Sequence, residues 1–215
     1  MSLMSSYSEI ISYVIALKNN NFKDLDISKF RENLDLKFEE AKREILITYK
    51  DEDYQNSLFA ICAWIDETVL CSSWKEKSEW KKAMLQQSFF GTAEAGEIFF
   101  EKLSNTPPNN IEVLEVYYYC MKLGFRGMFY RPNDITILNE KIKKIYKLII
   151  DEYDGEFEKP LNSCALTPIY KTTKNEQVKK SSKKLKPKKI GLWLIPIAPF
   201  VIVSVIFNVI VMVYF

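Results

Sequence analysis

YQNSLFAICAWIDETV, residues 54–69, sets the architecture expected for the chain. Its apolar side chains return every three or four residues, which predicts an α-helix with one face in a core. These side chains are Tyr54, Leu58, Ile61, Ile65 and Val69. The segment is expected to end near the Cys71-Ser72-Ser73 stretch.

Six other segments show the same helical spacing, and no segment shows a sustained alternation typical of a strand. They span about 7–17, 27–49, 78–85, 92–103, 114–121 and 135–149. Ser28, Ser78 and Thr92 are expected to be N-caps, because their hydroxyl groups can accept the first free N–H groups of a helix. Gly124 is expected to stop its helix in a left-handed conformation. The sequence thus predicts an all-α fold of about seven helices.

Composition excludes several classes of catalytic and metal site. The 215 residues contain no histidine, so Ser-His-Asp and Cys-His catalysis and histidine-ligated metal sites are ruled out. Only six glycines are present, which argues against glycine-rich phosphate loops. We expect no cofactor and no metal, and we interpret the chain as a scaffold rather than an enzyme.

The C-terminal part, residues 190–215, contains no charged residue. A helix of this length extends roughly 39 Å, enough to cross a hydrocarbon core of about 30 Å. Seven lysines precede it: Lys179, Lys180, Lys183, Lys184, Lys186, Lys188 and Lys189. By the positive-inside rule they hold that side in the cytoplasm. We therefore predict one transmembrane helix in a bacterial inner membrane, with the N-terminus cytoplasmic and the C-terminus periplasmic.

Charge divides the chain into three parts. The net charge is +2, but nine lysines and one glutamate from Lys171 onward contribute +8 and leave −6 for residues 1–170. We expect a cytoplasmic helical domain at 1–155, a lysine-rich linker at 156–189 and the membrane helix at 190–215. Beside a membrane span, anionic lipid is a simpler partner for these lysines than nucleic acid, which we do not expect to bind.

Asp66 and Glu67 interrupt the apolar segment and are candidates for a partner-binding surface, together with Glu97 and Arg126. Adjacent helical positions lie about 100° apart, so Asp66 and Glu67 cannot face each other as an acid/base pair. Arg126 is expected to pair with one of them. The structural alternative is a carboxylate that accepts hydrogen bonds from backbone or tyrosine groups at a helix junction. A catalytic alternative is a membrane-tethered hydrolase that uses Asp66 and Glu97.

Four motifs in this order resemble the DotU/IcmH family, the TssL subunit of type VI secretion systems. They are AICAWIDETVL, the pair Trp74 and Trp80, LQQSFFGTAEAGEIFFEKL and LEVYYYCMKLGFRGMF. The positions that match the family pattern are Asp66, Glu67, Gly96, Glu97, Gly124, Phe125 and Gly127. Among these, Gly96, Gly124, Phe125 and Gly127 are expected to be structural.

The resemblance implies an inner-membrane component that scaffolds the secretion machine and docks its cytoplasmic baseplate. It implies a cytoplasmic domain of two small helical bundles forming a hook. The implied partners are the IcmF-like subunit TssM, the baseplate subunit TssK, and a second copy of the chain in a dimer. A DotU component of a type IVB secretion system is the alternative within the same fold.

Overall fold

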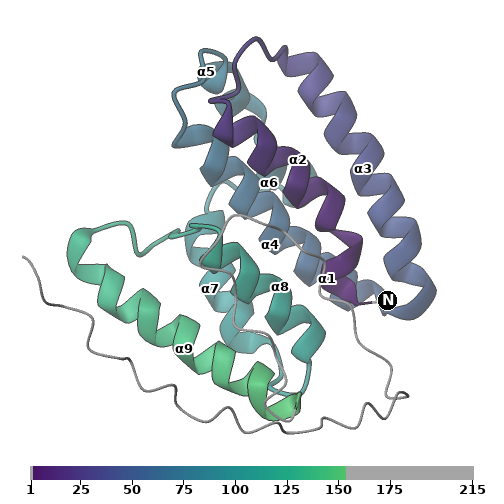
Figure 1. Cartoon of the computed structure of the whole chain (residues 1–215), viewed down its shortest axis with the longest axis vertical. Helices are drawn as coiled ribbons and strands as arrows, with labels where there is room; N and C mark the ends of the chain where they lie inside the picture. The colour runs from purple at the N-terminus through teal and green to yellow at the C-terminus, as the bar shows by residue number, and fades with distance from the viewer. Residues whose placement is uncertain (1, 154–215) are drawn as a thin grey trace, which may run out of the picture. The chain divides into compact units, whose positions relative to one another are not determined.

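The computed structural model describes residues 2–153, and its regular structure there is entirely helical (Figure 1). These residues form seven helices of at least six residues, together with the single-turn helices α1 and α5 and two 3-10 segments. The elements are α1 (Leu3–Ser6), α2 (Ser8–Asn19), α3 (Ile27–Thr48), α4 (Asp51–Leu70), α5 (Lys77–Trp80), η1 (Lys81–Ala83), α6 (Leu85–Phe90), α7 (Ala95–Asn105), α8 (Ile111–Lys122), η2 (Pro132–Asp134) and α9 (Ile135–Glu152). The predicted all-α class is confirmed.

Helix α4 is the central element of the core. It packs against α2, α3, α5, α6, α7 and α8. Every residue from Ser57 to Asp66 is buried, so the helix is covered on all sides rather than on the single face predicted from its spacing. A helix surrounded in this way needs apolar residues around its whole circumference, which the run from Leu58 to Ile65 supplies.

Two aromatic clusters fill the space beside α4. In the first, Phe30 of α3 lies 5.0 Å from Trp80 and 5.8 Å from Trp74, measured between ring centroids. In the second, Phe99 of α7 lies 4.1 Å from Phe125 and 4.7 Å from Tyr117. Aromatic rings bury large areas and favour tilted contacts at these separations. The two clusters join α3 to the α4–α6 connection, and α7 to α8 and the turn that follows it.

The predicted helix ends are partly wrong. Asp26, not Ser28, caps α3 and accepts a hydrogen bond from the Lys29 N–H at 3.0 Å. Ser78 lies inside α5. Thr92, three residues before α7 begins, accepts a bond from the Glu94 N–H at 3.1 Å and is not the N-cap, which is Glu94.

The prediction that a helix stops at Gly124 in a left-handed conformation is confirmed. Gly124 has a φ of +108°. Its N–H donates to the Met121 carbonyl at 3.1 Å, while the Phe125 N–H donates to the Cys120 carbonyl at 3.0 Å. These two bonds make a Schellman motif, which satisfies the last carbonyls of α8.

The segment predicted as one helix over 78–85 is broken in two. The backbone turns at Met84, where ψ is 153°, and a new helix, α6, begins at Leu85. The sequence predicted one helix because Trp80, Met84 and Leu85 are apolar and follow one another at helical spacing. A contact from α4, described below, accounts for the new start.

No helix within residues 2–153 is both long enough and apolar enough to cross a membrane. The predicted linker at 156–189 and the predicted membrane helix at 190–215 lie outside the described residues. The hook of two bundles remains a prediction.

Candidate functional site

Asp66 is fully buried and holds the start of α6. Its Oδ1 accepts hydrogen bonds from Trp80 Nε1 at 2.9 Å and from the Leu85 N–H at 3.0 Å, and its Oδ2 accepts one from the Gln86 N–H at 2.8 Å. The first N–H groups of a helix have no partners within it, and Met84 at the N-cap supplies no side-chain bond. Asp66 therefore caps α6 from another helix.

The environment of Asp66 has two opposite effects on its pKa. Burial raises the pKa above its usual range, and hydrogen bonds from Gln86, Leu85 and Trp80 act in the other direction. Because the side chain has no exposed surface, direct contact of Asp66 with a partner does not fit its position. The structural alternative, a carboxylate at a helix junction, does fit.

Gln86 extends this connection to α7. Its Oε1 accepts a hydrogen bond from the Ala95 N–H at 2.8 Å, at the first residue of α7. Asp66, Gln86 and Ala95 thus link α4, α6 and α7 through two successive caps. Gln86 was not among the predicted site residues, since nothing in the sequence distinguishes it from the neighbouring Gln87 or shows its partner.

The Glu67 side chain bonds to a different part of the chain, the turn after α8. Its Oε1 accepts a hydrogen bond from the Arg126 N–H and its Oε2 accepts one from the Gly127 N–H, both at 2.8 Å. Burial raises the pKa of this half-buried carboxyl, while the bonds from Gly127 and Arg126 and the charges of Arg126 and Lys18 oppose the rise. Glu67 therefore holds the turn after α8 in place.

That turn also packs backbone to backbone against α7. The Met128 N–H donates to the Gly96 carbonyl at 3.0 Å, and Gly127 has a φ of +51°. A β-carbon on Gly127 would lie 2.5 Å from the Gly96 oxygen, and one on Gly96 would lie 3.3 Å from the Gly127 α-carbon. Phe125, between Gly124 and Gly127, is buried against Phe99. The four residues predicted to be structural thus come together at one junction.

The remaining predicted site residues, Arg126 and Glu97, are both exposed. The expected pairing of the Arg126 side chain with a carboxylate is not seen within residues 2–153. Arg126 meets Glu67 through its backbone N–H instead. Glu97 lies in the first turn of α7. It does not share a cleft with Asp66, which is buried and bonded to three N–H groups, so this arrangement does not provide the facing carboxylates of a glycosidase.

Glu67, Arg126 and Gly127 lie in the wall of a cleft of about 1020 Å³. The cleft is formed by the end of α2, the end of α4 and the segment after α8. The remaining lining residues are Lys18, Asn19, Asn21, Thr68, Cys71, Ser72, Ser73, Gly124 and Tyr130. Most of these are polar side chains from connections between helices, which is typical of binding surfaces.

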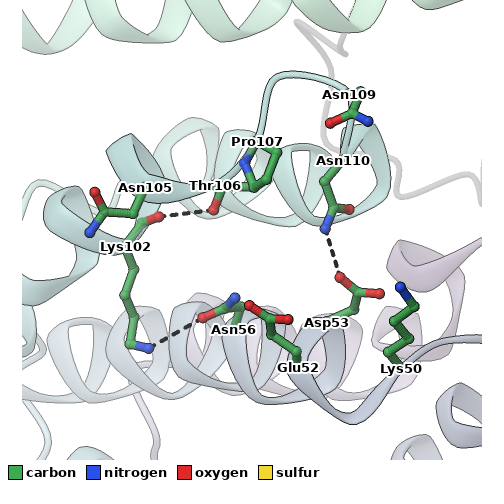
Figure 2. A pocket seen from close by; sticks show the side chains of 10 residues that line it. All are labelled: Lys50, Glu52, Asp53, Asn56, Lys102, Asn105, Thr106, Pro107, Asn109 and Asn110. Carbon is green, nitrogen blue, oxygen red and sulfur yellow. Dashed lines mark hydrogen bonds between the residues drawn. The ribbon is translucent and has the colours of Figure 1, made fainter.

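A second pocket, of about 540 Å³, lies between the first turns of α4 and the α7–α8 connection (Figure 2). Two hydrogen bonds cross it. Lys102 Nζ donates to Asn56 Oδ1 at 3.2 Å, and Asn110 Nδ2 donates to Asp53 Oδ1 at 2.6 Å. None of the predicted site residues lines this pocket.

Several solved structures are similar to this helical domain, among them the following three. The cytoplasmic domain of TssL from Acinetobacter baumannii is 26% identical, with a TM-score of 0.63, over 71% of this chain and 98% of that chain. TssL from Vibrio cholerae is 18% identical, with a TM-score of 0.59, over 69% and 95%. DotU from Francisella novicida is 19% identical, with a TM-score of 0.51, over 67% and 99%. The last two show likeness of fold alone.

The family comparison covers almost the whole sequence. The model described as "Type VI secretion system protein DotU" matches residues 2–215. No curated sequence matches the chain. The predicted resemblance is thereby confirmed, and it favours type VI over type IVB secretion. The chain belongs to the DotU family of type VI secretion system proteins, which are structural inner-membrane components of that machine.

Proposed function

We propose that this protein scaffolds the membrane complex of a type VI secretion system and docks the cytoplasmic baseplate at its helical domain, without catalysing a reaction. The proposed partners are an IcmF-like TssM subunit and a TssK baseplate subunit. The observation that carries the proposal is the hydrogen bonding of the Glu67 carboxylate. Both its oxygens accept backbone N–H groups of the turn at Arg126 and Gly127, so this carboxylate shapes the wall of the cleft.

The four candidate partner-binding residues divide into two roles under this proposal. Arg126 and Glu97 are exposed and are proposed to contact partners directly. Asp66 and Glu67 are proposed to position the contact surface, because their oxygens are bonded to protein N–H groups. Preorganised surfaces bind more tightly, since less ordering is needed on association.

Attachment to the inner membrane is proposed to use residues 190–215 as a single transmembrane helix. Its uncharged sequence and the preceding lysines support this. Those lysines are proposed to contact anionic lipid. A reporter fused after Phe215 should be active in the periplasm, and one at the N-terminus should be active in the cytoplasm. A cytoplasmic C-terminal reporter would contradict this topology.

Co-purification tests the docking role. The full-length chain, tagged and extracted in a mild detergent, should capture the TssM-like and TssK-like proteins of the same cells. The double variant Glu97→Gln/Arg126→Gln should capture less of at least one of them, since lost polar contacts commonly cost about 1–3 kcal/mol. Glu40→Gln, an exposed carboxylate change on α3, is the control. Failure of the wild type to capture either protein would refute the proposal.

A further inference from the structure

The cleft differs in charge from the domain around it. Residues 1–170 carry a net charge of −6, yet the charged residues that line the cleft are Lys18, Arg126 and Glu67. Both oxygens of Glu67 already accept backbone hydrogen bonds. The two cations, in contrast, are exposed, and no ion pair involves either of them within residues 2–153.

Lys18 and Arg126 lie beside the same turn. A β-carbon built on Gly124 would be 4.0 Å from Lys18 Nζ, which places the ammonium group next to the backbone two residues before Arg126. Burial raises the pKa of Glu67, and both charges oppose that rise, as expected for cations close to one carboxylate. An incoming anion would therefore meet two positive groups, one from the last turn of α2 and one from the turn after α8.

The rest of the lining favours a protein segment over a phosphate. The N–H groups of Arg126 and Gly127, which could form a backbone anion site, donate to Glu67. The side chains of Asn19, Asn21 and Ser73 can instead bond to peptide groups. Tyr130 is 65% exposed at the same cleft. Tyrosine and arginine are enriched where proteins bind most strongly.

We propose that the cleft binds an acidic segment of a partner protein, whose carboxylates pair with Lys18 and Arg126 and whose backbone lies against Tyr130. This inference rests on the proposed docking function and specifies the chemistry of the partner. Electrostatic pairing of this kind selects the partner and speeds association more than it adds affinity.

The competing explanation is that the two cations only stabilise helix ends. α2 ends at Asn19, α4 at Leu70 and α8 at Lys122, and residues at or just beyond all three ends line the cleft. The partial negative charge at a helix C-terminus favours nearby cations. If this were their only role, neutralising them would lower the melting temperature and leave binding unchanged.

A peptide-binding measurement separates the two explanations. The full-length chain is prepared in an uncharged detergent, with the seven lysines between 179 and 189 replaced by glutamine so that they do not bind the probe. The probe is a fluorescein-labelled peptide of alternating glutamate and serine, and the control probe has glutamine in place of glutamate. Fluorescence anisotropy should detect the glutamate probe alone, with affinity falling as salt increases.

Lys18→Gln/Arg126→Gln should weaken that affinity roughly 5- to 20-fold, in line with two exposed charge pairs. The charge-conserving variant Lys18→Arg/Arg126→Lys keeps both exposed positive charges and should bind within about twofold of the parent, which controls for misfolding. Lys143→Gln/Lys144→Gln removes two exposed charges from α9 and should also bind within about twofold. Equal binding by Lys18→Gln/Arg126→Gln and the parent, or no binding of the glutamate probe, would overturn the inference.

The chain has an acidic segment of its own that includes Asp154, Glu156 and Glu158. If neutralising these three residues strengthened probe binding, an intramolecular occupant would be indicated and the partner inference would fail. Co-purification of the TssM-like and TssK-like proteins tests the docking function separately. Capture that is unaffected by Lys18→Gln/Arg126→Gln would leave docking in place, but it would refute the acidic-segment inference and the proposed contact through Arg126.

Discussion

Gly96 and Gly127 touch backbone to backbone, so that a β-carbon on Gly127 would lie 2.5 Å from the carbonyl oxygen of Gly96. This contact joins the start of α7 to the turn after α8. The same turn is held from the other side by Glu67. The wall of the cleft is therefore fixed by two contacts between segments far apart in the sequence.

The first prediction is that Gly127→Ala destabilises the domain more than Gly91→Ala. Both glycines have positive φ, +51° and +66°, but only Gly127 is crowded, since no atom of residues 2–153 lies within 4 Å of a β-carbon at Gly91. The left-handed conformation costs an alanine about 1 kcal/mol at each position, and overpacking adds about 1–3 kcal/mol at Gly127. The melting temperature should fall by about 5–15 °C for Gly127→Ala and about 2–4 °C for Gly91→Ala. Equal shifts would contradict the close contact.

The second prediction concerns Asp66→Asn. The asparagine amide keeps one oxygen that accepts hydrogen bonds and replaces the other with an NH₂ group that donates them. This NH₂ group would face at least one of the N–H donors of Trp80, Leu85 and Gln86. Leaving buried groups unsatisfied should cost about 2–4 kcal/mol and lower the melting temperature by about 5–15 °C. Asp35→Asn, an exposed change on α3, should alter stability by less than about 0.5 kcal/mol. A small effect of Asp66→Asn would argue against its role as a cap.

The third prediction compares two buried tyrosines. Tyr7 Oη and Ser57 Oγ are hydrogen-bonded at 2.9 Å, whereas the buried hydroxyl of Tyr117 has no hydrogen-bond partner among residues 2–153. Tyr7→Phe should destabilise by about 1 kcal/mol, because Ser57 loses a partner, while Tyr117→Phe should be neutral or stabilising. Denaturant unfolding of the two variants measures the difference. Greater destabilisation by Tyr117→Phe would show that its hydroxyl has a partner.

The fourth prediction is a loss of stability at alkaline pH. Burial raises the pKa of Tyr118 to about 12 from 10.0, with a smaller contribution from the Tyr146 charge. Between these values the unfolded chain has released the proton and the folded chain has kept it. The stabilising contribution of Tyr118 is therefore complete below pH 10 and is lost as the pH rises toward 12.

Unfolding free energies at pH 9, 10, 11 and 12 test this prediction. The wild type should lose stability across the range, and Tyr118→Phe should lose less, because one group that binds protons differently in the two states is absent. Lysines and the other tyrosines titrate in both proteins and cancel in the comparison. Identical pH profiles would show that Tyr118 ionises equally in the folded and unfolded states.

Much of the helical framework follows from local sequence. The apolar spacing in 27–49 predicts a helix that the structure places at Ile27–Thr48, and that in 135–149 lies within Ile135–Glu152. These signals are readable because a helix repeats every 3.6 residues and buries one face. Gly124 was also readable, since few other residues tolerate positive φ after a helix. The family motifs identified the kind of protein before any contact was known.

Helix starts were harder to predict because several nearby residues can serve as caps. In the sequence around α3, Asp26 and Ser28 both have suitable side chains, and the structure uses Asp26. For α6 the cap is not local at all, since Asp66 supplies it from α4. No periodic pattern records such a bond, so the sequence suggested one continuous helix where two exist.

The sequence by itself determined the helical class, the family and the charged and glycine residues of the candidate site. Only the tertiary structure decided what those residues do. It turned Asp66 inward to cap α6, set Glu67 against the N–H groups of Arg126 and Gly127, and left the side chain of Arg126 exposed. The physical reason is that hydrogen bonding and desolvation depend on neighbours about 20 to 60 residues away along the chain, whereas sequence patterns report only the periodicity of a single helix.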